Sequence, residues 1–87
     1  MAYEVRIHRE ALKFYKSLPA EWRLRIDQAV EKLRQDPWRS DLDIKRLHGE
    51  HKGYFRLRLG TVRLVYTVDP EKGQIYIDAL GYRGSVY

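Results

Sequence analysis

The sequence contains no cysteine, which excludes disulfide bonds and zinc sites built on thiolates. It also lacks long apolar runs. The opening residues M-A-Y-E-V-R-I-H have no apolar core of the kind that signal peptides carry, and no stretch approaches the roughly 20 apolar residues of a membrane-spanning helix. We therefore expect a soluble, cytoplasmic protein that does not associate with membranes.

Acidic residues are the scarcer charged class, 12 against 17 Lys and Arg, which gives a net charge of +5. A positive surplus favours nucleic acid or an acidic protein as the partner. The acidic residues gather between Glu21 and Asp43, so the second half of the chain is the basic half. A length of 87 residues is too short for two independent cores, so we expect one domain over residues 1–87.

Residues 54–68 read Y-F-R-L-R-L-G-T-V-R-L-V-Y-T-V and alternate apolar with polar side chains on both sides of a Gly-Thr pair. Alternation indicates half-buried strands, because successive side chains of a strand point to opposite faces. Gly60 followed by one further residue suits a two-residue hairpin turn of type II′. Counting outward from that turn places Arg58 opposite Arg63, with Arg56 one step along. The hairpin is therefore predicted to have one apolar face and one arginine face.

Two interpretations of this arginine face are open from the residues alone. Like charges directly opposite each other destabilise a sheet by roughly 0.2–1 kcal/mol. The arginines could form a solvated polar face that limits aggregation. Alternatively, they could bind phosphate, in which case an anionic partner turns the electrostatic cost into a gain. We favour the phosphate-binding surface.

The rest of the chain predicts a small α+β fold. Residues 2–8 alternate like a strand, residues 9–18 and 19–35 repeat apolar side chains at helical spacing, and residues 75–80 alternate again. The expected element order is β-α-α-β-β-β, with a small antiparallel sheet. Two N-terminal helices should cover its apolar face and leave the arginine face open.

The last predicted strand also makes a pairing prediction. If Val68 faces Ile75, then Ile75, Ile77 and Ala79 lie on the apolar face. Asp78 then lies on the arginine face, where it could pair with Arg63.

Residues 37–52 are predicted to be the longest irregular segment, with Ile44 and Leu47 under the sheet edge. His48 and His51 have an H-x-x-H spacing, but no third ligand stands at a recognisable distance. We therefore expect neither a metal nor another cofactor, although the two histidines could contribute to an RNA-facing surface.

Taken together, these motifs resemble the RelE/ParE superfamily of toxins from bacterial and archaeal toxin–antitoxin modules. The resemblance covers nearly the whole chain: the Y-E-V-R-I-H opening, the S-L-P break between helices, K-R-L-H-G before the hairpin, the hairpin itself and the closing G-Y-R-G-S-V-Y. The order and spacing of these pieces carry it. The family fold, a small antiparallel sheet with two N-terminal helices, agrees with the fold predicted from the residues.

The resemblance implies a RelE-like mRNA interferase, a ribosome-dependent endoribonuclease that inhibits translation without a metal. In that reaction a 2′-hydroxyl attacks the adjacent phosphate. By position, Arg56 and Arg58 match two basic strand residues that are often lysines, and Arg63 and Arg83 match phosphate-clamping arginines. Tyr87 matches a C-terminal tyrosine implicated in proton transfer or base stacking. Further RNA contacts are expected from Lys45, Arg46, Lys52 and Tyr82.

The sequence departs from the family pattern at two places that bear on proton transfer. Arg56 and Arg58 stand where relatives often have lysine, and an arginine with a pKa above about 12 is a poor proton carrier. Tyr82 stands where many relatives have histidine, which removes one acid–base group. These departures predict slow catalysis, or catalysis that depends on the ribosome to position the RNA.

Two other functions are compatible with the same scaffold: a ParE-like inhibitor of DNA gyrase, and a catalytically weak member that only binds RNA or its antitoxin. All three predict a cognate antitoxin as partner in a toxin–antitoxin hetero-oligomer. An acidic or amphipathic antitoxin segment would suit a basic chain.

Overall fold

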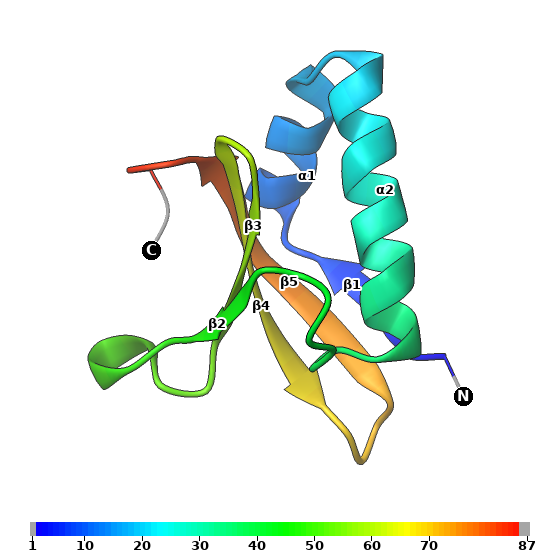
Figure 1. The fold of residues 1–87 in the computed structure, drawn as a ribbon, viewed down its shortest axis with the longest axis vertical. Helices are drawn as coiled ribbons and strands as arrows, with labels where there is room; N and C mark the ends of the chain where they lie inside the picture. Colours follow the sequence, from blue (N-terminus) through cyan, green and yellow to red (C-terminus); the bar gives the residue numbers. More distant parts are fainter. Residues whose placement is uncertain (1, 86–87) are drawn as a thin grey trace.

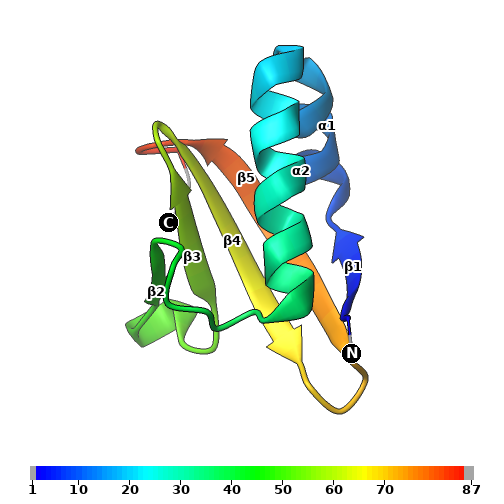
Figure 2. The same cartoon turned by 45° about the vertical axis from the view of Figure 1, so that its right-hand side comes forward.

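Two helices lie against one face of a five-stranded sheet in the computed structural model, which describes residues 2–85 (Figure 1). The elements are β1 (Glu4–Ile7), α1 (Arg9–Ser17), α2 (Ala20–Gln35), β2 (Ile44–Arg46), the 3-10 turn η1 (Gly49–His51), β3 (Phe55–Leu59), β4 (Val62–Asp69) and β5 (Gln74–Tyr82). Figure 2 shows α1 and α2 side by side over the sheet. The predicted α+β class and the order of the main elements are confirmed.

The sheet is mixed rather than purely antiparallel. Its strand order is β1-β5-β4-β3-β2, and β1 pairs with β5 in parallel, with Val5 opposite Ile75. The other neighbours are antiparallel. Alternation in the sequence identifies β1 as a strand but carries no information about its direction. That direction follows from the helical crossover, because parallel strands require a long connection.

The segment expected to be irregular contains the short strand β2. Its three residues pair with β3, and Ile44 lies opposite Leu57. A run this short shows too little alternation to be recognised in sequence. The pairing makes β2 one edge of the sheet, while β1 forms the other.

The register of the central hairpin is confirmed. Arg58 lies opposite Arg63, at the predicted distance from the turn. Gly60 has a φ of 58°, and a Cβ built there would lie 3.2 Å from the Cη2 atom of Trp22. The turn needs glycine both for its backbone conformation and for the close approach of α2.

A β-bulge in β5 changes the predicted pairing beyond Val68 and Ile75, which do face each other. The register shifts between Val65 and Tyr66, so that Ala79 pairs with Val65 and Ile77 with Tyr66. Asp78 is the extra residue. Beyond the bulge the faces are exchanged relative to the sequence prediction. Leu80 joins the core and Ala79 does not.

The core lies between the helices and the inner face of the sheet. The helices contribute Ala11, Leu18, Ile26, Ala29 and Leu33, and the strands contribute Leu57, Val62, Leu64, Tyr66, Ile75, Ile77 and Leu80. Tyr66 is fully buried, and its hydroxyl donates a 2.7 Å hydrogen bond to the Pro37 carbonyl. Burial raises the pKa of this phenol. The bond attaches the chain after α2 to the centre of the sheet.

The N-terminus of α1 is capped by a side chain, and its C-terminus by a backbone hydrogen bond from Leu18 to Tyr15. His8 is exposed and caps α1: its Nδ1 atom accepts a 3.0 Å hydrogen bond from the Glu10 backbone N–H. Pro19 separates α1 from α2 at the predicted break. Among residues 2–85, neither helix has the length and apolar character needed to cross a bilayer.

Candidate functional site

The sheet face opposite the helices brings four arginines together. Arg56 and Arg58 alternate with core residues along β3, and Arg63 lies across from Arg58 on β4. The residue facing Arg63 on β5 is Gly81, which has no side chain to fill the space. Just beyond β5, the Arg83 backbone N–H donates a 2.8 Å hydrogen bond to the Thr61 carbonyl, which holds it beside the hairpin turn. We call these residues, Arg56, Arg58, Arg63 and Arg83, the arginine cluster.

Arg63 is the anchored member of the arginine cluster. It is the only charged residue among those described that is classed as buried, with 6% of its surface exposed. Its Nη1 atom donates to the carbonyls of Gly60 and Val62, at 2.6 and 3.2 Å. Burial lowers the pKa of this guanidinium, and the positive charges of Arg58, Arg56 and Arg83 lower it further. An anion between these groups would relieve that repulsion.

Arg56 has an unsatisfied donor. Its Nε atom is buried and has no hydrogen-bond partner among residues 2–85. A buried donor without an acceptor costs about 1–3 kcal/mol. A ligand oxygen that accepts a hydrogen bond from this Nε atom would remove that cost.

Asp43 is the carboxylate that accompanies the cluster, in place of the predicted Asp78. The Arg58 backbone N–H donates to the Asp43 carbonyl at 2.9 Å, and the carboxylate lies 3.9 Å from the Arg58 Nε atom. Its negative charge also acts on Arg63. No hydrogen bond or ion pair joins Asp78 to Arg63 in the described chain, because the bulge removes Asp78 from the expected register. Sequence reasoning missed Asp43, which precedes the unpredicted strand β2.

The predicted RNA-contacting residues divide between two faces. Lys45 lies opposite Arg56 on β2 and so extends the arginine cluster toward the sheet edge. Arg46, the next residue, turns to the helix side, where its guanidinium carbon lies 5.8 Å from the centre of the Phe55 ring. Lys52 follows η1 and is exposed.

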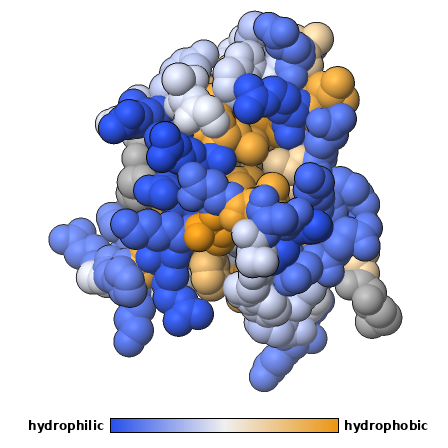
Figure 3. All heavy atoms as spheres, in the orientation of Figure 1, coloured by the Kyte–Doolittle hydropathy of each residue, from blue (hydrophilic) through white to orange (hydrophobic). Residues whose placement is uncertain are grey.

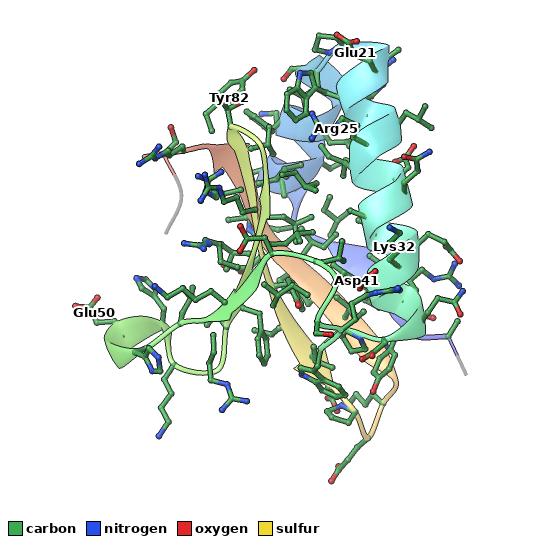
Figure 4. All side chains as sticks on the ribbon, viewed as in Figure 1. Glu21, Arg25, Lys32, Asp41, Glu50 and Tyr82 are labelled. Atoms are coloured by element: carbon green, nitrogen blue, oxygen red, sulfur yellow. The ribbon has the colours of Figure 1, made fainter. Side chains whose placement is uncertain are left out.

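The two predicted tyrosines are not placed among the arginines. Tyr82 lies opposite Val62, a core residue, and its ring packs edge-on against Phe14 at 5.0 Å. It is half exposed at the end of the sheet (Figure 4). Its neighbours Gly81 and Arg83 belong to the other face. Tyr87 lies outside the described residues.

The open face of the sheet carries cationic side chains. In the orientation of Figure 1, Figure 3 shows a strip of apolar residues with hydrophilic residues on either side of it. Among residues 2–85, no group of three or more His, Cys, Asp or Glu side chains is arranged to hold a metal. Guanidinium groups bind phosphate oxygens through pairs of parallel hydrogen bonds. The arginine cluster can therefore hold a phosphodiester and stabilise additional negative charge on it.

Comparison with known proteins gives relatives that extend over the whole chain. No protein-family model matches. RelE1 of Methanocaldococcus jannaschii is 33% identical over 88 residues, an alignment that covers 100% of this chain and 97% of that protein.

Solved structures agree with this relationship. The archaeal RelE–RelB complex from Pyrococcus horikoshii OT3 has a TM-score of 0.82 at 32% identity and covers 99% of this chain and 100% of its own. The toxin–antitoxin complex RelBE2 from Mycobacterium tuberculosis has a TM-score of 0.80 at 30% identity, over 95% of this chain and 100% of its own. Isolated RelE from E. coli, at 22% identity and a TM-score of 0.79 over 98% of this chain and 88% of its own, shares the fold. Identity over the full length together with the common fold shows that the chain belongs to the RelE/ParE superfamily of toxins from toxin–antitoxin modules.

Proposed function

We propose that the protein is the toxin of a type II toxin–antitoxin system and cuts mRNA on the ribosome. The observation that carries this proposal is the anchored Arg63, held on the open face of the sheet among three further arginines, with Asp43 as the one carboxylate described beside them. Such a surface fits a phosphodiester better than any uncharged ligand. A target on translating ribosomes requires the protein to act in the cytoplasm.

The reaction we propose is attack of a ribose 2′-hydroxyl on the neighbouring phosphorus. The new bond joins the 2′ oxygen to phosphorus, and the bond from phosphorus to the 5′ oxygen breaks. The products are a 2′,3′-cyclic phosphate and a 5′-hydroxyl. The phosphate gains negative charge in the transition state, so fixed cations accelerate the step without a metal. Arg63 and Arg83 would clamp the phosphate, while Arg56 and Arg58 would stabilise the added charge.

Proton transfer is the second requirement, because the 2′-hydroxyl loses a proton and the 5′ oxygen gains one. Arginine stays protonated at neutral pH and cannot carry out this exchange. We assign it to Tyr87, whose ordinary pKa near 10 would have to be lowered by the arginines for it to act as a base. The variant Tyr87→Phe should then abolish cleavage and leave RNA binding unchanged.

We further propose a cognate antitoxin as the partner in a hetero-oligomer. The Pyrococcus and Mycobacterium relatives were solved in complex with antitoxins. A net charge of +5 and an exposed arginine cluster suit an acidic or amphipathic antitoxin segment.

Cleavage of mRNA in a purified translation system tests this function. The wild-type chain should cut ribosome-bound mRNA, and the Arg63→Ala/Arg83→Ala variant should lose that activity while keeping its circular dichroism spectrum. The matched control is Arg9→Ala/Lys13→Ala, which removes two exposed positive charges from the helix layer. Cleavage by the folded cluster variant at the wild-type rate would overturn the mechanism.

A DNA gyrase supercoiling assay distinguishes the mRNA interferase from a ParE-like inhibitor of gyrase. Inhibition of supercoiling with intact mRNA would select the ParE-like function. Tight RNA binding without cleavage on translating ribosomes would select the catalytically weak one.

A further inference from the structure

A cavity opens at the β2 edge of the sheet, on the helix side and not on the face that carries the arginine cluster. It measures about 420 Å³, within the range of about 300–1,000 Å³ usual for small-molecule sites. Its lining includes Trp38 from the segment after α2, Ile44 and Arg46 from β2, and Phe55 from β3. We call it the edge pocket.

Trp38 presents an aromatic ring to solvent in the edge pocket. It is 49% exposed, which is unusual for a large apolar side chain. Its backbone N–H donates a 3.0 Å hydrogen bond to the Asp36 carboxylate, and Tyr3 packs against the ring edge-on at 6.3 Å. Tyr3 therefore supports the ring on one side, and about half of the Trp38 surface stays open to solvent.

Arg46 caps an aromatic stack that reaches the core. Its guanidinium lies over Phe55, and Phe55 stacks on the buried Tyr66 with ring centres 5.5 Å apart and planes at 24°. Arg46 makes no ion pair among residues 2–85. By contrast Arg39, which also lines the pocket, is neutralised by Asp41, with Nη2 at 3.0 Å from Oδ2. The pocket thus combines the exposed ring of Trp38 with the flat guanidinium of Arg46, whose positive charge is not compensated by an ion pair within the described chain.

The edge pocket and the arginine cluster lie on opposite faces of the sheet, and the short strand β2 separates them. Consecutive side chains of β2 point to opposite faces, so Lys45 lies beside Arg56 while Arg46 faces the pocket. In Figure 1, β2 forms the outer border of the sheet. A polyanion that leaves the arginine cluster over this border meets Lys45 first and Arg46 next.

We infer that the edge pocket binds an unpaired base of the RNA strand whose phosphate lies in the arginine cluster. Single-stranded RNA is recognised by stacking of its bases on aromatic rings and on arginine planes, with cations following its backbone. A protein segment would also gain from contact with Trp38 and Arg46, but a base is favoured because the proposed phosphate site lies just across β2 and would bring the same RNA strand to this edge. The inference rests on the proposed function, and it adds a base-reading site to that function's phosphate site.

Tryptophan fluorescence tests the inference, because the chain has two tryptophans that can be separated. The variant Trp22→Phe leaves Trp38 as the reporter in the pocket. The variant Trp38→Phe leaves Trp22, which stacks with Arg25 at 4.4 Å beside the hairpin turn, as the matched control. The probe is a 2′-O-methylated RNA hexanucleotide, which cannot be cleaved, at low ionic strength. We expect the probe to quench Trp38 and to leave Trp22 unchanged.

Two further experiments test whether it is the base, and not the sugar–phosphate backbone, that occupies the pocket. A hexamer of the same backbone without bases should bind but should not quench Trp38. The variants Trp38→Ala and Arg46→Ala should each raise the dissociation constant of the base-bearing hexamer roughly tenfold, as expected for loss of one stacked base, and that of the abasic hexamer much less.

The outcomes separate this inference from the proposed function. If binding depends on Arg63 and Arg83 but Trp38 is not quenched, the base site is overturned and the phosphate site stands. If the hexamer binds the Arg63→Ala/Arg83→Ala variant as tightly as the wild-type chain, the phosphate site itself is contradicted. If the hexamer does not bind the wild-type chain, the base site is overturned, and the cleavage assay on ribosomes decides the proposed function separately. Quenching of Trp38 by the cognate antitoxin and not by RNA would make the pocket a protein-docking site and would overturn the inference.

Discussion

At the scale of single residues, Arg63 combines burial with positive charge. A buried cation is normally tolerated only when it is paired, yet the hydrogen bonds that hold Arg63 go to neutral carbonyls. The positive charges of the other three arginines act on it more strongly than the negative charge of Asp43. The free energy stored in this repulsion is available to a bound phosphate. The sequence indicated which arginines share a face, whereas the burial of one of them came from tertiary packing.

Arg63→Lys should therefore be a poor substitute in cleavage. Lysine keeps the charge but loses the planar fork that can hold two phosphate oxygens at once. Removal of one donor that stabilises transition-state charge typically costs about 10²–10³ in rate, and the lysine variant should lose much of that range. Rates on ribosome-bound mRNA measure the effect, with Arg9→Lys as the control for an arginine on the helix side. Full cleavage activity of Arg63→Lys would show that cleavage needs only the positive charge at this position and not the planar donor geometry of arginine.

Tyr66 makes a prediction about stability rather than activity. Tyr66→Phe removes the hydroxyl that donates to the Pro37 carbonyl and leaves that acceptor unpaired in the interior. We expect the free energy of unfolding to fall by about 1–3 kcal/mol. The matched control is Tyr76→Phe, because Tyr76 is exposed. Urea denaturation of both variants measures the difference, and equal midpoints would contradict the role assigned to this hydrogen bond.

At the scale of elements, the β3–β4 hairpin carries the site and α2 fixes its turn. Gly60→Ala should destabilise the fold more than Gly73→Ala. Both glycines have positive φ, 58° and 64°, so both substitutions introduce backbone strain. A Cβ at Gly60 would also lie 3.2 Å from the Trp22 ring, whereas a Cβ at Gly73 would meet nothing within 4 Å. Thermal unfolding of the two variants isolates the packing contribution. A larger loss for Gly73→Ala would exclude the close approach of α2 as the reason for glycine.

At the scale of the whole molecule, the net charge of +5 and the arginine cluster on the open face of the sheet favour a polyanionic ligand. Binding of single-stranded RNA should weaken linearly on a log–log plot as salt rises, because neutralised phosphates release counterions. Arg58→Ala should reduce the magnitude of that slope by about one unit. The comparison variant Lys13→Ala should leave the slope unchanged. RNA titrations at several salt concentrations measure the slopes of both variants and of the wild-type chain. Identical slopes for Arg58→Ala and wild type would show that Arg58 does not contact phosphate.

The sequence by itself determined the helices, the hairpin register and the side of the sheet on which Arg56, Arg58 and Arg63 lie. These features depend on local periodicity, which fixes the direction of each side chain within its own element. The same local motifs, in their order, were sufficient to indicate the RelE/ParE superfamily.

Tertiary structure alone decided the features that depend on contacts between distant segments. The bulge at Asp78 moved Leu80 into the core and left Asp43, rather than Asp78, beside the arginines. Strand β2 exists because β3 offers an edge to pair with, and β1 is parallel because the helices carry the chain back across the sheet. Each of these features reduces the number of unpaired backbone groups and the exposed apolar surface of the whole fold. Both quantities depend on contacts between distant segments, so a short stretch of sequence does not reveal them.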